Sequence, residues 1–380
     1  MAIEQIFTNA SIVLPDEIVK GSVLVRDGEI ADISTGSLHT GEDFEGDYLI
    51  PGLVELHTDH LETHYSPRPG LRWMKMAAIQ AHDAQIVTSG ITTVFDCLRM
   101  GSAEGDDGFA TGEMRAMADA LAEAEHENRL RADHRIHLRC EVSTDNVLDQ
   151  FDAFRDDPKV GLVSLMDHAP GQRQFQTMDQ YILYYKIKRG LSDEAFAVYV
   201  EKQLALSERN SARHRIALAE LCAARGIPIA SHDDATVAHV EESIDLGVKL
   251  AEFPTSLEAA DLSHDAGLSV LMGAPNVVRG GSHSGNIAAR DLAERGVLDV
   301  LSSDYVPFSL IHAPFLLADA IEGFGLEKAI ALVSDNPART VGLEDRGRIA
   351  IGRRADLVRV ERPSGVPIVR SVWRKGRRVA

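Results

Sequence analysis

The sequence has few cysteines, a deficit of positive charge and no long apolar run, and each shortage argues against a class of protein. The three cysteines, Cys97, Cys140 and Cys222, form no Cys-x-x-Cys pair, which indicates reduced thiols in a cytoplasm rather than a secreted disulfide framework. The 39 Lys and Arg against 58 Asp and Glu give a net charge of −19, which argues against non-specific binding to nucleic acid or anionic lipid. No apolar stretch approaches the roughly 18 residues of a membrane span, and the N-terminus lacks the pattern of a signal peptide. We therefore expect a soluble cytoplasmic protein without nucleic-acid or membrane partners.

The remaining composition is that of a folded protein. Of the 380 residues, 44% are hydrophobic and 26% are charged, so the chain can bury a large core without disulfides or metal staples. At about 150 residues per domain, this length allows two or three units, or one barrel with an appendage.

Short apolar strands alternate with helical stretches through the middle of the chain. We expect strands at 49–57, 91–96, 135–142, 160–168, 227–232, 248–254, 269–274 and 297–304, and helices that include 112–128, 193–225 and 315–324. Strands alternating with helices predict parallel strands with crossover helices, and eight such units over about 250 residues match an α/β fold of the (β/α)8 TIM-barrel type. A doubly wound open sheet is the alternative, but no Gly-x-Gly-x-x-Gly follows the first strand.

Both ends of the chain have the pattern of a small sheet. Before residue 49 the apolar segments are short, and Asp27-Gly28 is a hairpin signal because glycine tolerates the positive φ of a tight turn. After Asn336 the sequence again alternates like strands. We therefore expect a small β-sandwich domain from residues 1–49 and 341–380, and a metal-dependent barrel catalytic domain from residues 50–340.

Ligand-type side chains gather at the carboxyl ends of the expected strands, where barrels of this kind place their catalytic groups. The candidate metal ligands are His57, Asp59, Glu141, His168, His232 and Asp304. A single histidine at a strand end is more often a hydrogen-bonded structural residue, but five such ends favour a divalent metal, with one or two ions and a bridging carboxylate. We expect zinc. Glu252 is a weaker candidate because Phe253-Pro254 can simply close the strand. The histidines with no individual assignment are His60, His64, His82, His239, His264 and His312.

A glycine-rich loop follows the seventh expected strand and suggests phosphate binding. Glycines let successive backbone N–H groups converge on an anion, and an arginine adds a bidentate fork. The candidate phosphate contacts in this loop are Arg279, Gly280, Gly281, Ser282 and His283. Arg68 and Arg173, which follow the first and fourth strands, could reach the same mouth of the barrel or could simply be solvated.

Two segments resemble the amidohydrolase superfamily. The segment 49–57, Leu-Ile-Pro-Gly-Leu-Val-Glu-Leu-His, resembles its first barrel strand, and the segments 336–338, 347–349 and 355–358 resemble its exit into the flanking sheet. A finer resemblance is to the triphosphate diphosphatase family of the carbon–phosphorus lyase pathway for phosphonate use. It covers essentially the whole chain and depends on the segments 57–59, 67–69, 165–175, 231–236, 279–286 and 302–305.

This resemblance implies hydrolysis of α-D-ribose 1-methylphosphonate 5-triphosphate to the 5-phosphate, with release of pyrophosphate, by a metal-dependent barrel. It also implies that Asp304 is the base that deprotonates the attacking water. The chain departs from the commonest superfamily pattern because His57-x-Asp59 replaces His-x-His and Asp167-His168 ends the fourth strand without a lysine. Glu141 is our substitute for that lysine. The expected partner is a small phosphorylated sugar, and the oligomeric state is open, a homo-oligomer included.

Two other functions remain open. A cyclic-amide hydrolase or nucleobase deaminase would share the fold and metal site, but it would not need the phosphate-binding loop at 279–286. A non-catalytic scaffold is disfavoured because all six proposed ligands are present.

Overall fold

The centre of the molecule is a barrel of eight parallel strands. The computed structural model describes residues 4–36, 38, 40–68, 70–101, 112–170, 173, 182, 186, 192–281 and 286–380. The barrel strands are β6 (Leu53–Thr58), β7 (Ile91–Met100), β8 (Asp133–Glu141), β9 (Val160–Met166), β10 (Ile229–His232), β11 (Leu250–Glu252), β12 (Ser269–Gly273) and β13 (Val300–Ser302). They pair in chain order, and a parallel bridge between Thr58 and Asp304 joins the last strand to the first. The barrel class is confirmed, and each expected strand contains a barrel strand. The one expected at 49–57 divides, because residues 48–51 pair in the terminal sheet and only Leu53–Thr58 lies in the barrel.

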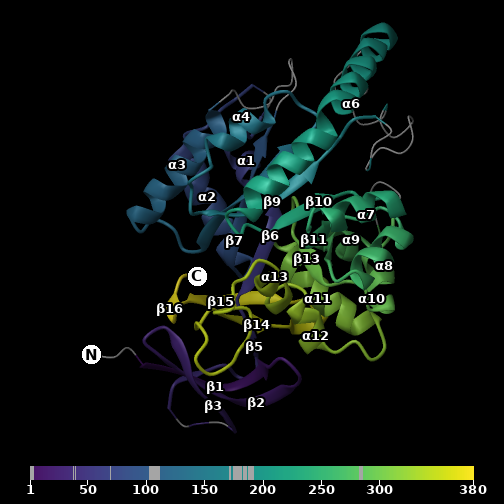
Figure 1. Cartoon of the computed structure of the whole chain (residues 1–380). Coiled ribbons are helices and arrows are strands. Elements are labelled where there is room, and N and C mark those ends of the chain that lie inside the picture. Colours follow the sequence, from purple (N-terminus) through teal and green to yellow (C-terminus); the bar gives the residue numbers. More distant parts are fainter. Residues whose placement is uncertain are drawn as a thin grey trace.

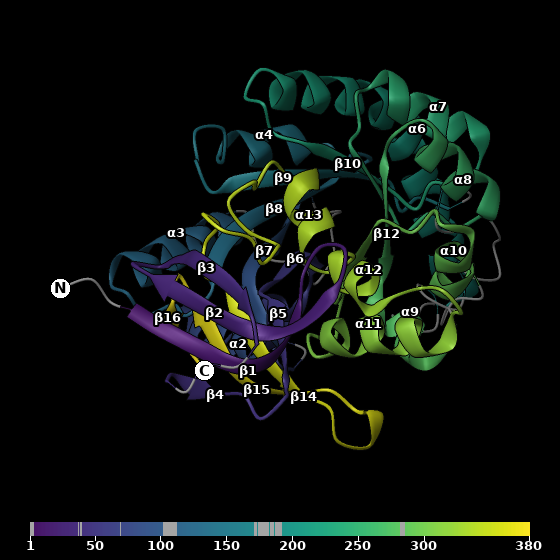
Figure 2. The same cartoon turned by 90° about the horizontal axis from the view of Figure 1, so that it is seen from below.

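Helices follow the strands and surround the barrel (Figures 1 and 2). They are α1 (His60–Tyr65), α2 (Lys75–Thr88), α3 (Glu113–His126), α4 (Val147–Asp152), α6 (Asp193–Ala223), α7 (Val237–Asp245), α8 (Leu257–Asp265), α9 (Ala274–Arg279), α10 (Ala289–Arg295), α11 (Ser309–Ala320), α12 (Leu326–Ala331) and α13 (Asp335–Thr340). Two of the expected helices match α3 and α6 closely. The helix expected at 315–324 begins earlier, at Ser309, because its buried face extends from Ser309 to Leu317 through Pro314. None of the described helices combines the length and apolarity that crossing a bilayer requires.

The two chain ends form one mixed sheet beneath the barrel, drawn in purple and yellow in Figure 1. Its strands are β1 (Glu4–Val13), β2 (Ile18–Arg26), β3 (Glu29–Thr35), β4 (Glu42–Asp43), β5 (Tyr48–Pro51), β14 (Leu357–Glu361), β15 (Ile368–Arg374) and β16 (Arg377–Arg378). Asp27 and Gly28, with φ of 52° and 87°, make the expected hairpin between β2 and β3. A terminal β-structure interrupted by the barrel is therefore confirmed, while the domain boundaries stay a prediction.

Apolar packing fixes both parts. Inside the barrel, Val54, Leu56 and Phe95 pack with side chains of the later strands in one buried cluster. The terminal sheet has its own core, in which Phe7 and Trp373 from opposite chain ends lie with ring centroids 4.7 Å apart. Polar side chains at the carboxyl ends of the barrel strands are thereby held over a closely packed interior.

Candidate metal centre

Glu252 lies at the centre of the polar cluster. It ends β11, is fully buried, and accepts hydrogen bonds at two oxygens: His57 Nδ1 donates to Oε1 at 3.1 Å and His232 Nδ1 to Oε2 at 3.1 Å. The Ser164 hydroxyl also donates to Oε2, at 2.7 Å. Burial raises the pKa of Glu252, but His57 and His137 outweigh it and hold the pKa well below its usual range. Glu252 is therefore a buried carboxylate shared by two histidines.

This arrangement decides which ring nitrogens of His57 and His232 are free. A carboxylate only accepts, so both imidazoles carry their proton on Nδ1 and keep the Nε2 lone pair. The two rings are stacked with centroids 5.6 Å apart. Histidines that bind metals are held in this way, with the second nitrogen donating to a carboxylate.

His168 repeats the pattern on the neighbouring strand. Its Nδ1 lies 2.5 Å from Glu141 Oε2, and its backbone N–H donates to Glu141 Oε1 at 3.0 Å. The His168 and His232 rings have centroids 5.7 Å apart. The structure thus brings the two predicted ligands Glu141 and His168 together, with Glu141 positioning the imidazole.

Asp59 pairs with an arginine. It follows β6, and its carboxylate accepts a hydrogen bond from the Arg139 guanidinium. Burial raises the pKa of Asp59, but Arg139 and then His57 outweigh it and hold the pKa well below its usual range. Asp59 is therefore an ionised carboxylate beside the two strands that carry His57 and Glu141.

Asp304 closes the barrel at the same end. Its backbone N–H donates to the His57 carbonyl at 3.1 Å, and the Asp59 N–H donates to the Asp304 carbonyl at 3.0 Å. Below it, Glu55 accepts from the N–H groups of His57 at 2.7 Å and Ser303 at 2.6 Å. Burial raises the pKa of Asp304, which makes its carboxylate a stronger base than a solvated aspartate.

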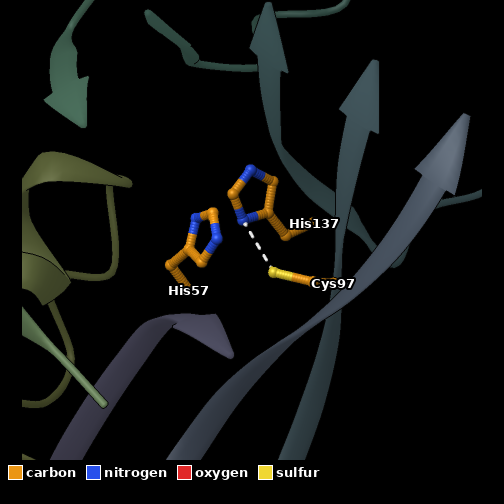
Figure 3. Close-up of side chains that lie close together, drawn as sticks. All are labelled: His57, Cys97 and His137. Carbon is orange, nitrogen blue, oxygen red and sulfur yellow. Dashed lines mark hydrogen bonds between the residues drawn. The ribbon is translucent and has the colours of Figure 1, made fainter. Parts of the chain in front are cut away.

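A buried layer beneath the cluster consists of His137 and Cys97. Figure 3 shows both against His57, with Cys97 Sγ 3.5 Å from His137 Nδ1. His137 Nδ1 lies 2.9 Å from the Leu56 carbonyl and its Nε2 2.5 Å from the Ser164 hydroxyl. Burial raises the pKa of the Cys97 thiol well above its usual range, which keeps it protonated. Both nitrogens of His137 are therefore engaged within the barrel.

The expected phosphate loop is placed in part. Arg279 is exposed at the end of α9, and Ser282 and His283 lie outside the described residues. The N–H groups of Gly280 and Gly281 donate to carbonyls of α9, at 3.1 and 2.8 Å. These two amides cap the helix, so in this arrangement they are already used.

The other two arginines differ sharply in their surroundings. Arg68 is exposed, whereas Arg173 is 2% exposed and pairs with Asp234 and with Glu242, the latter at 2.6 Å. Burial and then Arg215 lower the pKa of Arg173 to about 9. Arg173 lines a cavity of about 440 Å³ with residues of α6 and α7.

Comparison with known proteins shows which family has this sequence and fold. The sequence profile of the amidohydrolase family matches residues 48–379. The chain belongs to the amidohydrolase family. It is similar to the α-D-ribose 1-methylphosphonate 5-triphosphate diphosphatase of Escherichia coli K12, at 48% identity over 377 residues, or 98% of this chain and 100% of the relative. An imidazolonepropionase of Streptomyces griseus is 38% identical over only 103 residues, 24% of this chain and 26% of its own.

Solved amidohydrolase-like structures show the same fold at low identity. A 5-methylcytosine deaminase from Klebsiella pneumoniae superimposes with a TM-score of 0.65 and 15% identity, over 99% of this chain and 98% of that one. An N-acetylglucosamine-6-phosphate deacetylase from Pasteurella multocida gives a TM-score of 0.65 and 12% identity, over 99% of both chains.

A side-chain group of this amidohydrolase fits a divalent ion at the open nitrogens. His168, His232 and Asp233 each offer a ligand atom within 4.8 Å of the others. His57, His232 and Glu252 are equally close, but Glu252 accepts from both Nδ1 atoms there and so orients the rings. Asp233 Oδ2 is buried without a hydrogen-bond donor, 3.3 Å from His232 Nε2. His232 Nε2 carries a lone pair, so it cannot donate to Asp233 Oδ2. A cation bound by His232 Nε2 and Asp233 Oδ2 would satisfy both atoms.

Glu252, Ser164 and His137 are the contributors that the sequence interpretation missed or undervalued. The signal for Glu252 was its place at the end of the sixth strand, but β11 has only three residues, all buried, so no alternation marks its inward side. Serine at position 164 and histidine at position 137 lie inside strands, where their side chains look like ordinary core positions.

Proposed function

We propose that this amidohydrolase cleaves the α–β phosphoanhydride of α-D-ribose 1-methylphosphonate 5-triphosphate, giving the 5-phosphate and pyrophosphate. The observation that carries the proposal is the 48% identity with the E. coli diphosphatase over 98% of this chain and the whole relative. The match extends over the barrel and both chain ends, so it is not confined to one part of the fold. The carboxylate-held histidines at the barrel mouth support hydrolysis as the reaction type.

The metal centre that we propose uses His57, His168 and His232 as imidazole ligands. Zinc suits these nitrogen donors, and one or two ions with Asp59, Glu141 or Asp304 as further ligands stay predictions. When bound, a divalent ion lowers the pKa of water toward ~7 and stabilises charge on phosphoryl oxygens. Glu252 and Glu141 orient the imidazoles through their Nδ1 protons.

Asp304 takes the proton in the proposed reaction. One O–H bond of water breaks toward the Asp304 carboxylate as the water oxygen bonds to the α-phosphorus and the bond to the bridging oxygen breaks. That electron pair leaves with pyrophosphate, a weak base that needs no strong general acid. The raised pKa of Asp304 suits this role, because a base works best when its pKa approaches the working pH.

Positive charge for the polyphosphate comes from the arginines. Arg279, with its loop, is proposed for the leaving pyrophosphate, since a protein of net charge −19 must concentrate positive charge where a polyanion binds. Arg68 and Arg173 stay candidates for the same mouth. We further propose a cytoplasmic location, which agrees with Cys97, Cys140 and Cys222 being buried free thiols.

A substrate panel tests the proposed function. Purified protein is loaded with zinc and incubated with the ribose methylphosphonate triphosphate, with a nucleoside triphosphate, with hydantoin and with cytosine, and ³¹P NMR and ammonia release are followed. We expect pyrophosphate from the first compound at the highest kcat/KM. Turnover of hydantoin or cytosine without pyrophosphate release would favour the cyclic-amide hydrolase or deaminase instead.

A further inference from the structure

Three histidines form a separate cluster beside the barrel mouth. His60 and His64 lie one turn apart on α1, and His82 comes from α2. The ring centroids are 4.8 Å apart for His60 and His64, 5.9 Å for His60 and His82, and 6.1 Å for His64 and His82. One nitrogen from each ring lies within 4.8 Å of the others. Nothing in the proposed hydrolysis uses these side chains.

The hydrogen bonds of the cluster leave the same nitrogen open on each ring. His82 Nε2 lies 2.7 Å from a carboxylate oxygen of Asp96, which can only accept, so the proton is on Nε2 and Nδ1 keeps its lone pair. His64 Nε2 lies 3.2 Å from the side-chain oxygen of Gln85, which leaves its Nδ1 open in the same way. His60 Nδ1 is buried with no hydrogen-bond partner.

Burial makes these open nitrogens significant. His82 is 0% exposed and His60 is 8% exposed, and the Nδ1 atoms of both lack any hydrogen-bond partner. Leaving buried polar atoms unsatisfied costs free energy, so folded proteins pair almost all of them. Two such atoms, in a cluster where each of three imidazoles offers a nitrogen within 4.8 Å of the others, are explained if a cation lies between the rings.

We propose a second divalent-metal site, of the zinc class, held by His60, His64 and His82. Two histidines four residues apart on one helix face are a common zinc-binding pair, and a third imidazole with one water completes four-coordination. Asp96 plays the orienting part, since it accepts from His82 at 2.7 Å and from His134 Nδ1 at 2.7 Å. The ion would fix α1, which directly follows Asp59, against α2.

This site is distinct from the barrel-mouth centre. Among the described residues, the histidine cluster shares no side chain with the groups around His57, His168 and His232. Its ligands come from two helices outside the barrel strands, whereas those of the central site come from strand ends. The two sites should therefore load and lose metal independently.

Metal counting on purified, zinc-reconstituted protein tests the inference. Zinc per chain is measured by inductively coupled plasma mass spectrometry for the wild type, His64→Asn, His232→Ala and the double variant. His126→Asn is the matched control, because His126 occupies the last turn of α3 as His64 does that of α1, but is exposed. We expect His64→Asn to lose about one equivalent of zinc per chain and His126→Asn to lose none. The variant that combines His64→Asn with His232→Ala should lose the sum of the losses of those two single variants.

A spectroscopic measurement keeps the test valid if one of the variants does not fold. Cobalt titration of the metal-free wild type and of His232→Ala should give ligand-field absorption of a tetrahedral nitrogen site in both. In the His232→Ala background, adding His60→Asn or His64→Asn should remove that absorption. Equal zinc content in the wild type, His64→Asn and His60→Asn would overturn the proposal. So would a cobalt spectrum that disappears entirely in His232→Ala. Either result would reduce the cluster to hydrogen-bonded packing.

Discussion

Glu252 shows how one buried carboxylate can prepare two imidazoles for a metal. Its two oxygens each accept from a histidine Nδ1, so both rings have the same tautomer and the same open nitrogen. Two separate carboxylates at this point would repel each other. One side-chain amide has a single acceptor oxygen, and its NH2 group would face the second ring without an acceptor. A shared carboxylate satisfies the geometry with a single buried negative charge, which a divalent ion would then offset.

Glu252→Gln tests this orienting role. Glutamine keeps the shape but offers one acceptor oxygen, so His57 or His232 loses its partner. We expect metal affinity to fall roughly 10- to 100-fold, as for other residues that orient metal-binding histidines. Zinc affinity is measured by competition with a chelator, with the exposed Glu258→Gln as control. Unchanged zinc affinity in Glu252→Gln would contradict the role.

Asp304→Asn separates a base from a metal ligand. Asparagine tolerates the left-handed φ of 54° at this position, so the backbone at the barrel closure should be preserved. Loss of a general base predicts a decrease in kcat of about 10²- to 10⁴-fold with zinc still bound. If zinc and activity are lost together, Asp304 is a ligand rather than the base.

Arg279→Ala tests the polyphosphate contact. Removing one charge-assisted hydrogen bond costs ~1.5–3 kcal/mol, roughly tenfold to a hundredfold in kcat/KM for the triphosphate. Metal content should not change. Arg295→Ala, which removes an arginine from the last turn of the next helix, is the control and should leave kcat/KM unchanged. Equal rates for wild type and Arg279→Ala would remove this arginine from the site.

At the scale of elements, the strands were predictable and the details of their ends were not. Each barrel strand contains a short apolar run, and the recurrence of such runs between helical stretches located all eight. The position of Glu252 was harder to judge, because Phe253 follows it with a left-handed φ of 54° that turns the chain away abruptly. Asp233 and Asp304 have the same backbone conformation after their strands. Such turns at a strand end are set by tertiary packing, which no local pattern records.

The pairing of Asp59 with Arg139 could not be predicted from the sequence either. Asp59 was expected at a strand end, but its contact with Arg139 depends on the arrangement of two strands whose residues are 80 positions apart. Similarly, the sequence predicted that the amides of Gly280 and Gly281 could bind an anion. In the structure both donate to carbonyls of α9. Side-chain types at the mouth of a barrel can be predicted, whereas their partners require the closed sheet.

An ion network at the opposite end of the barrel joins it to the terminal sheet. Asp133 begins β8 and accepts from Arg346 at 2.5 Å and from Arg354 at 3.4 Å, and both arginines are buried. Burial raises the pKa of Asp133, but these arginines outweigh it and hold the pKa well below its usual range. Its stabilising effect is therefore complete above the unfolded pKa of about 3.9 and is lost as pH falls below it.

Asp133→Asn should consequently lower stability at neutral pH and flatten its acid dependence. We expect a loss of ~1.5–3 kcal/mol in the free energy of unfolding at pH 7, shrinking as the pH falls below about 4. Urea unfolding between pH 3 and 7 measures it. The control is Asp119→Asn, which removes an exposed ion pair with Arg115 and should cost under about 1 kcal/mol. A constant difference across this pH range would contradict the assignment.

In the whole molecule, the terminal sheet lies at one end of the barrel and the polar cluster lies at the other. The sheet joins strands from both chain ends, which Figure 2 shows from below. Their side chains share one core, and Asp133 at the start of β8 ties this sheet to the N-terminal side of the barrel. The opposite end carries the carboxylate-held histidines and Asp304. This separation of stability from chemistry follows the general plan of barrel enzymes, in which reactive groups lie at the carboxyl ends of the strands.

In the proposed reaction, water attacks the α-phosphorus of a ribose triphosphate at this end of the barrel. The most direct test is a reaction of the zinc-loaded protein with α-D-ribose 1-methylphosphonate 5-triphosphate in ¹⁸O-labelled water, followed by ³¹P NMR and mass spectrometry. Attack at the α-phosphorus predicts one ¹⁸O in the ribose 5-phosphate product and none in pyrophosphate. Label in pyrophosphate, or release of inorganic phosphate instead of pyrophosphate, would contradict it.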